Sequence, residues 1–209
     1  MLELIRKLLD WLAALRKPTR NETIYEEHRP AQPRQTPAGL VLRDAILPAL
    51  HTLPAAMDSI QARAILLAIA GQEADFHHRW QVLNTPGVKG PARGLWQFER
   101  GGGVAGVLRH ASSASHARSI AQQRVGDTAP DAVWQALERD DILAALYARL
   151  LLWTDPKALP PVGDIEGAWA LYLRCWRPGA WTRGNEAQRA GLRAKWTRYY
   201  AQAMTEVSS

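Results

Sequence analysis

The most apolar helical pattern in the chain covers residues 59–72, and it leaves almost no polar face. A helix that is apolar all round is buried on all sides, so we expect this one to be the central helix of the domain. Asp58, followed by Gln61 three residues later, is expected to cap its N-terminus as a capping box. The apolar residues of this stretch are Ile60, Ala64, Ile65, Leu66, Leu67, Ala68, Ile69 and Ala70.

Helical periodicity recurs through most of the remaining chain. The stretch 40–53 contains Pro48, which predicts a kinked or split helix. N-caps of three further helices are expected at Asp131, at Asp140 or Asp141, and at Asp164. The helix that follows Asp164 has four apolar or aromatic residues on one face, namely Trp169, Tyr172, Leu173 and Trp176. The predicted helices cover residues 40–53, 59–72, 104–110, 132–139, 140 or 141–153, 165–176 and 186–204.

Residues 82–98 interrupt the helical pattern. They contain three glycines and two prolines and end in Leu-Trp-Gln-Phe at 95–98. Glycine and proline mark turns, so we expect loop, turn and one or two short strands here. The predicted fold class is therefore mostly α, of the α+β kind, with helices around a buried central helix and a small strand region beside it.

The first 36 residues have a different pattern. Apolar residues at positions 2, 5, 8, 9, 12 and 15 fall on one face, which predicts an amphipathic helix. Pro30, Pro33 and Pro37 within a polar stretch favour an extended linker. We therefore predict a helix and linker at residues 1–36 and a globular domain at 37–209. The helix could pack on the protein itself, dock to a partner protein, or bind a membrane surface through residues 1–17.

Composition excludes several classes of protein. A single cysteine, Cys175, rules out an intramolecular disulfide framework. Neither H-E-x-x-H nor C-x-x-C is present, so we expect no metal site and no cofactor. The chain contains no run of eighteen apolar residues, so the sequence predicts no membrane span. Residues 1–17 lack the features of a signal peptide, so we expect the chain to be made in the cytoplasm.

The formal net charge of +6 is concentrated near the C-terminus, because residues 174–198 carry seven basic side chains and one acidic one. Such a segment suits a polyanion: peptidoglycan carboxylates, teichoic or lipid phosphates, or nucleic acid. A solvated helix face is an equally good interpretation.

Glu73 ends the apolar helix and is the only glutamate between residues 28 and 98. Apolar surroundings and a helix C-terminus both disfavour a negative charge, so its pKa is expected to rise. A carboxyl that stays protonated near neutral pH can act as the general acid that glycosidic cleavage requires. The alternative interpretation is a solvated residue at a helix end.

Residues 94–98 offer the features of a sugar-binding wall. Gly94 permits close approach of a backbone to a flat ring. Trp96 or Phe98 could stack on that ring, and the Gln97 amide both donates and accepts hydrogen bonds. An ordinary core strand with one polar residue is the alternative.

Together the two segments resemble the soluble lytic transglycosylases and the wider lysozyme-like superfamily. Those proteins show Glu-Ser-x-Phe at the end of a buried helix, where this chain has Glu-Ala-Asp-Phe at 73–76. Further on they show Gly-Ala-x-Gly-Leu-Met-Gln, where residues 90–97 read Gly-Pro-Ala-Arg-Gly-Leu-Trp-Gln. The resemblance implies a lysozyme-like fold whose strand region forms the cleft wall, with Glu73 as general acid and later base. It implies a substrate-binding set of Gly94, Leu95, Trp96, Gln97, Phe98 and Tyr172.

The chain departs from the family pattern at several positions. Ala74 replaces the usual serine, Trp96 replaces the usual methionine, and the later Ala-Tyr-Asn-Ala-Gly motif is absent as such. Residues 168–172, Ala-Trp-Ala-Leu-Tyr, offer Tyr172 as the equivalent tyrosine. Residues 169–181 look like a segment of lysozyme-like proteins from bacteriophages and prophages. This likeness implies a virion-associated protein, or one delivered to the periplasm or cell wall, with a virion protein as a possible partner of residues 1–17.

The resemblance implies cleavage of peptidoglycan glycan strands between N-acetylmuramic acid and N-acetylglucosamine. A lytic transglycosylase needs one carboxylic acid, whereas a lysozyme-type hydrolase usually needs a second carboxylate. Asp75 and Glu99 are the nearest candidates in sequence, and no motif marks either, so the single-acid interpretation is favoured.

Two other classes remain open. The first is a non-catalytic virion or cell-wall-binding module on the same fold. The second is a nucleic-acid-binding protein that uses the basic, Trp-rich C-terminal segment. This second class leaves the segments around Glu73 and Gln97 unexplained, so nucleic acid is not the expected partner.

Overall fold

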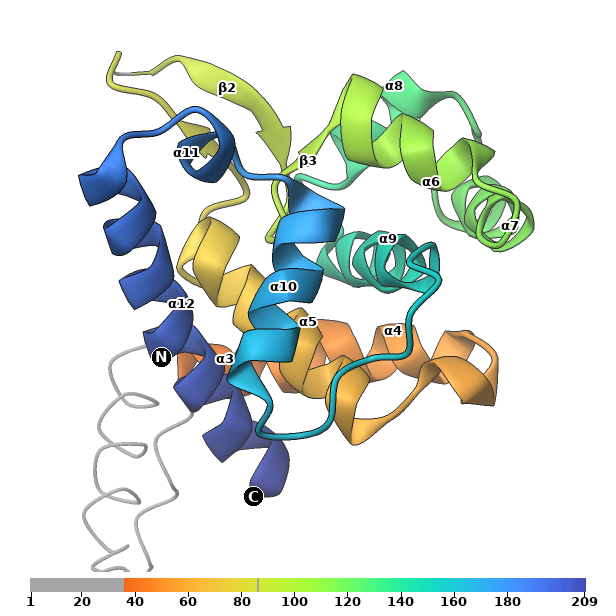
Figure 1. The fold of residues 1–209 in the computed structure, drawn as a ribbon. Coiled ribbons are helices and arrows are strands. Elements are labelled where there is room, and N and C mark those ends of the chain that lie inside the picture. The colour runs from red at the N-terminus through yellow and green to blue at the C-terminus, as the bar shows by residue number, and fades with distance from the viewer. Residues whose placement is uncertain (1–35, 86) are drawn as a thin grey trace, which may run out of the picture. The chain divides into compact units, whose positions relative to one another are not determined.

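The computed structural model describes residues 36–85 and 87–209 (Figure 1). One compact unit covers Thr36–Ser209. The predicted amphipathic helix and all of the predicted linker except Thr36 lie outside the described residues. Thr36 itself belongs to the compact unit, because its side chain accepts a hydrogen bond from the Gly39 amide and caps the first described helix.

The predicted central helix is confirmed as α5 (Ile60–Ala74), which has eleven of its fifteen residues buried. Figure 1 shows α5 in the middle of the unit, with the sheet beyond its C-terminal end. Its N-cap is Ser59, whose hydroxyl accepts from the Ala62 amide at 3.2 Å. The predicted cap, Asp58, instead binds the Arg63 guanidinium. The cap therefore lies one residue later than predicted, and the predicted capping box with Gln61 is wrong.

The predicted kink or split of the helix at Pro48 is replaced by a π-helical segment just before this residue. The helix runs from α3 (Pro37–Val41) through a π-helical segment (Leu42–Ile46) into α4 (Leu47–Thr52). Pro48 stands in the first turn of α4 after the π segment. A π segment changes the hydrogen-bond register and accommodates local strain without ending the helix. A short 3₁₀ helix (Ala55–Met57) then leads to α5.

A small antiparallel sheet follows α5, formed by β1 (Trp80–Val82), β2 (Lys89–Arg93) and β3 (Phe98–Glu99) in that order. Residues 94–97, which the sequence assigned in part to a strand, form a tight turn between β2 and β3. Gly94 has φ +73° there, and a Cβ atom at this position would lie 2.8 Å from the Leu137 carbonyl oxygen. Only glycine can adopt this positive φ and fit this close to the Leu137 carbonyl without strain.

Of the remaining helices, α9 and α12 pack directly on α5. Asp140 and Asp164 cap α9 and α10 as predicted, through bonds from Leu143 N and Gly167 N. Asp131 is not a cap, because it lies inside α8, whose N-cap is Ala129. Helices α7 and α11 were not predicted from the sequence. The helical elements that follow β3 along the chain are η3 (Arg100–Val104), α6 (Ala105–Arg109), α7 (Ala114–Arg124), α8 (Pro130–Ala136), α9 (Asp141–Trp153), α10 (Ile165–Trp176), α11 (Gly179–Thr182) and α12 (Glu186–Ser208).

The fold is thus mostly helical with one small antiparallel sheet, as the sequence predicted at the level of class. No helix within 36–85 and 87–209 is long and apolar enough to cross a membrane.

A chain that begins at Thr36 is expected to fold alone and to melt within a few degrees of the full chain, because the compact unit begins there. A chain that begins at Leu42 is the matched control. It loses the Thr36 cap and buried Val41, which together stabilise by about 2–4 kcal/mol. Thermal unfolding followed by circular dichroism measures both. Loss of cooperative unfolding in the first truncation would mean that residues 1–35 belong to the core.

Candidate active site

Glu73 is partly buried at the end of α5, where α10 brings a tyrosine to its carboxyl group. The Tyr172 hydroxyl donates to Glu73 Oε1 at 2.6 Å, and Tyr172 itself is only 1% exposed. Tyr172 lies 99 residues further along the chain, so this contact depends on the packing of α10 against α5. The structure therefore places next to Glu73 the tyrosine that the sequence offered as a site residue.

Burial raises the pKa of Glu73 from 4.5 to about 7. The Tyr172 hydrogen bond and the positive charge of Lys195 act in the opposite direction, but they do not cancel the cost of desolvating the carboxylate. About half of the Glu73 carboxyl groups therefore carry a proton near neutral pH. A group in this state can donate a proton and later accept one.

Asp75, two residues on, has the opposite electrostatic environment. It adopts a left-handed conformation with φ +49°, which ends α5. The Tyr199 hydroxyl donates to Asp75 Oδ1, and Lys195 Nζ lies 3.3 Å from each carboxylate oxygen. Burial alone would raise the pKa of Asp75, but the Tyr199 hydrogen bond and the Lys195 charge outweigh it and lower the pKa. The two neighbouring carboxyl groups are thus driven into different protonation states, a pattern typical of acid and base assignments in active sites.

Lys195 and Tyr199 were not among the predicted site residues. Both belong to α12 and lie one helical turn apart. Tyr199 lies within the predicted helix at 186–204 and Lys195 within the basic segment at 174–198, and neither position pointed to the end of α5. A signal that could have found them is the i, i+4 spacing of a cation and a phenol on one helix face.

Gln97 holds the turn between β2 and β3 in place. Its Nε2 donates to the Gly94 carbonyl at 2.9 Å and to the His78 carbonyl at 3.2 Å. The same turn is tied to α10, because Trp176 Nε1 donates to the Trp96 carbonyl at 2.9 Å. Trp176 stacks on Tyr172, so α10 contacts both the turn and Glu73. The packing of α10 thus connects the two segments that the sequence singled out.

The predicted stacking of Trp96 or Phe98 on a sugar ring is contradicted by the structure. Leu95, Trp96 and Phe98 are at most 2% exposed, and Gly94 is buried as well. Trp96 Nε1 donates to the Leu66 carbonyl inside the core, and the Phe98 ring packs edge-to-face on Tyr147. A ring with no exposed face cannot stack on a sugar. The prediction was wrong because burying the apolar side chains of this turn gains more free energy than exposing them to solvent.

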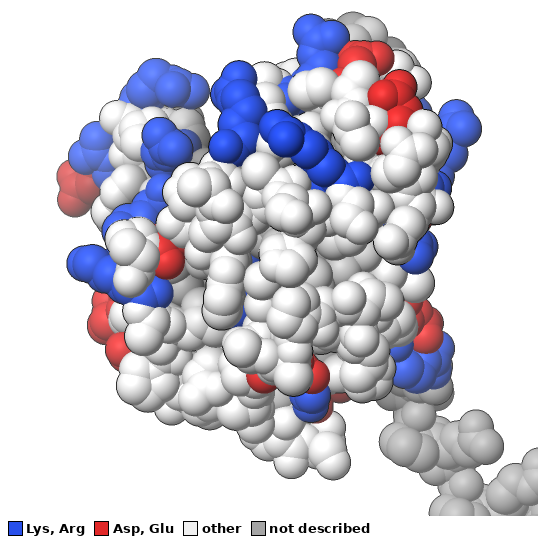
Figure 2. Space-filling model, turned by 90° about the vertical axis from the view of Figure 1, so that its right-hand side faces the viewer, with Lys and Arg blue, Asp and Glu red and all other residues white. Residues whose placement is uncertain are grey.

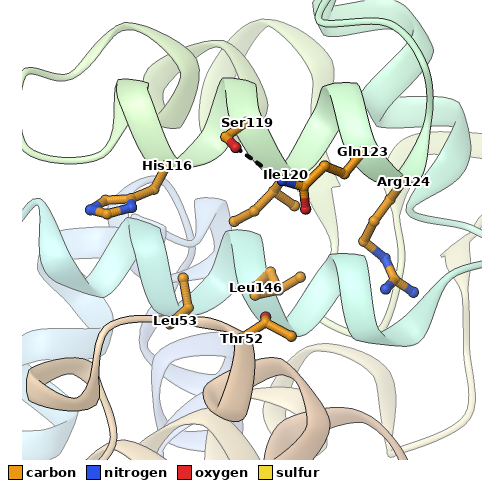
Figure 3. A pocket seen from close by; sticks show the side chains of 8 residues that line it. All are labelled: Thr52, Leu53, His116, Ser119, Ile120, Gln123, Arg124 and Leu146. Atoms are coloured by element: carbon orange, nitrogen blue, oxygen red, sulfur yellow. Dashed lines mark hydrogen bonds between the residues drawn. The ribbon is translucent and has the colours of Figure 1, made fainter.

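Two pockets lie elsewhere in the described part of the chain, and Glu73 lines neither. One of about 150 Å³ lies between α7, α9 and the end of α4 (Figure 3). Ile120, Leu146 and Leu53 lie between His116 and Arg124 in this view, and the Arg124 guanidinium is held by Asp140. The other, of about 260 Å³, adjoins the end of α9. The candidate active site is therefore centred on Glu73 and its partner Tyr172, with Asp75 two residues further along the chain.

The basic C-terminal segment is partly neutralised by ion pairs. Arg174 binds Asp155, Arg193 binds Glu166, and Lys195 binds Asp75.

On the face drawn in Figure 2, Lys and Arg lie mainly around the periphery, some beside Asp and Glu, and most of the centre is uncharged. Over the residues that the structure describes, no group of three or more His, Cys, Asp and Glu side chains is placed to hold a metal ion.

No protein-family model, no curated protein and no solved structure matches this chain. The lysozyme-like resemblance therefore stays a prediction from the two short motifs.

For the glycosidase activity that the sequence predicts, Gln97→Ala is expected to lower the rate about tenfold. The amide makes two hydrogen bonds that fix the turn, each worth about 0.5–1.5 kcal/mol. Steady-state rates on peptidoglycan, with the melting temperature measured in parallel, test this. Gln81→Ala on β1 is the control for an ordinary sheet residue. Loss of folding without a specific kinetic defect would make Gln97 a purely structural residue.

Proposed function

We propose that this protein is a peptidoglycan-degrading glycosidase that cleaves the β-1,4 bond between N-acetylmuramic acid and N-acetylglucosamine. The observation that carries this proposal is the Glu73 carboxyl group, which has a pKa of about 7 and accepts a hydrogen bond from Tyr172. The order of Glu73, the glycine-containing turn and Tyr172 along the chain supports it, because this order follows the resemblance to lytic transglycosylases.

In the proposed reaction, protonated Glu73 donates its proton to the glycosidic oxygen as the bond from this oxygen to the anomeric carbon breaks. The leaving sugar departs with a neutral hydroxyl, and Glu73 becomes a carboxylate. The Tyr172 hydroxyl then donates to a charged oxygen, and such a hydrogen bond is stronger than one to a neutral acid. Glu73 next accepts a proton from the nucleophile that attacks the anomeric carbon.

The nucleophile distinguishes two reaction types. In a lytic transglycosylase it is the 6-hydroxyl of the muramic acid residue, which gives an anhydro sugar. In a hydrolase it is water, usually with help from a second carboxylate. Asp75 is already engaged by Tyr199 and Lys195, and Glu99 is exposed on β3. These environments favour the single-acid reaction.

We further propose that the protein is encoded by a phage or prophage, and that it acts in the virion or at the cell wall. This part rests on the resemblance of residues 169–181 to a segment of lysozyme-like proteins from bacteriophages and prophages.

Digestion of purified peptidoglycan, followed by mass measurement of the soluble products, tests the proposed reaction. Anhydro-muramic ends are expected, and reducing ends would identify a hydrolase instead. Glu73→Gln is the matched negative control. An absence of products from the wild-type protein, at several pH values between about 5 and 8, would overturn the proposal.

One observation favours a non-catalytic cell-wall-binding module instead. Ala74, which is fully buried, supplies no hydroxyl beside the acid. Co-sedimentation with insoluble peptidoglycan that is unaffected by Glu73→Gln, together with an absence of soluble products, would identify this module.

A further inference from the structure

A pocket of about 260 Å³ lies where α9 ends and the chain turns toward α10. Its wall combines two cations with an apolar surface, and Glu73 takes no part in it. The lining residues are Arg149, Leu152, Trp153, Asp155, Pro156, Lys157, Ala158 and Leu159.

Arg149 is the unusual member of this pocket, because it is only 2% exposed and has no ion-pair partner among residues 36–85 and 87–209. Its Nε donates to the Met57 carbonyl at 2.7 Å, while its buried Nη1 has no hydrogen-bond partner within the described part of the chain. The nearby carboxylate of Asp58 is occupied on both oxygens by Arg63, at 2.8 and 2.7 Å.

A buried guanidinium without an ion-pair partner is costly, because buried charges are normally paired and fully hydrogen-bonded. Burial lowers the pKa of Arg149 to about 10, so the group keeps its charge near neutral pH. Arg149 lines the pocket, so an anion bound there would supply the missing negative charge beside it.

The surroundings define which anion fits. Lys157 is exposed in the pocket wall and adds a second positive charge. The negative charge of Asp155 is balanced by the Arg174 guanidinium at 2.9 Å and by the Lys157 amide at 2.9 Å. The Trp153 ring, 36% exposed, lies 5.0 Å from the Arg149 guanidinium carbon and gives the pocket an apolar face.

We propose that this pocket binds a small organic carboxylate, with the carboxylate group at Arg149 and Lys157 and a short apolar body against Trp153 and Leu159. The volume lies below the range of about 300–1,000 Å³ that is typical for drug-sized ligands, which favours a small ligand. The apolar part of the wall favours an organic acid over inorganic phosphate. This site is independent of the proposed glycosidase reaction.

Titration of the full chain with isobutyrate, followed by two-dimensional NMR of the amides and indoles, tests the proposal. Saturable shifts are expected at the Trp153 indole and the Lys157 amide, with millimolar affinity. Isobutyramide has nearly the same shape but no charge, and it is expected to bind at least about tenfold more weakly because it forms no charge-assisted hydrogen bond. Inorganic phosphate serves as the second anion, and tighter binding of phosphate would overturn the choice of an organic acid.

Variants identify the residues that bind. Arg149→Met keeps much of the side-chain volume, and isobutyrate is expected to bind it at least about tenfold more weakly. Lys157→Gln, at an exposed position, is expected to reduce affinity a few-fold and to remove most of its salt dependence. Arg43→Gln, an exposed cation outside the pocket, is the matched control. If Arg149→Met fails to fold, the amide comparison and Lys157→Gln still decide. Equal binding of acid and amide, or no saturable shift up to tens of millimolar, would overturn the proposal.

Discussion

Replacing Glu73 with glutamine is expected to abolish peptidoglycan cleavage while the fold is retained. Glutamine keeps the shape and can still accept the Tyr172 hydrogen bond, but it cannot donate a proton to the glycosidic oxygen. General acid catalysis contributes about 10²–10⁴-fold, and the rate of soluble product release should fall by that amount. A variant that keeps more than about a tenth of the wild-type rate would show that Glu73 is not the general acid.

The same substitution is expected to stabilise the protein at alkaline pH. The folded-state pKa of Glu73 is about 7, above the value of 4.5 for an unperturbed carboxyl, so the folded protein binds this proton more tightly than the unfolded chain does. Stability therefore falls as pH rises from 4.5 through 7, by an amount on the order of 3 kcal/mol. Glutamine has no charge to desolvate. The melting temperature of Glu73→Gln should exceed that of the wild type at about pH 8 and approach it at about pH 4.

Asp75→Asn and Glu99→Gln are the matched controls, since each also exchanges one carboxylate for an amide. For a single-acid lyase, both variants are expected to remain active. If Asp75→Asn is as inactive as Glu73→Gln, the reaction uses two carboxylates. Wild-type activity should decline above pH 7 as Glu73 loses its proton, and this limb of the pH profile should follow the folded-state pKa.

Tyr172→Phe is expected to reduce the catalytic rate constant by about 10- to 100-fold. The hydroxyl stabilises the Glu73 carboxylate that forms during proton transfer, and a hydrogen bond to a charged group contributes about 1.5–3 kcal/mol. Because this bond lowers the pKa of Glu73, its loss should also move the alkaline limb of the pH–rate profile upward. Initial rates measured across the pH range record both effects.

Tyr199→Phe provides the control for this experiment, because it removes an equivalent hydroxyl from Asp75 instead of Glu73. It should leave the position of the alkaline limb almost unchanged. A lower rate in Tyr172→Phe with no change in the pH profile would contradict a role of Tyr172 in tuning the acid. It would indicate a packing role only.

Local patterns in the sequence were sufficient to predict several elements. The central position of α5 follows from its apolar residues on every face, and the starts of α9 and α10 follow from Asp140 and Asp164. These features depend on residues three or four positions apart, which the sequence displays directly. Helix α7 was missed because only two of its residues, both alanine, are buried, so its apolar stripe is weak. The class of fold and the place of Glu73 at a helix end were therefore determined by the sequence alone.

Only the tertiary structure decided which side chains surround the two carboxyl groups. Tyr172 reaches Glu73 across 99 residues, and Lys195 reaches Asp75 across 120. The direction of Trp96, into the core and not toward a sugar, depends on the packing of its turn against α5. That Arg149 has no ion-pair partner within residues 36–85 and 87–209 is likewise invisible in the sequence, because it depends on which carboxylates the fold brings near. Such contacts join residues far apart along the chain, and burial, which sets the pKa of Glu73, exists only once these segments have packed together.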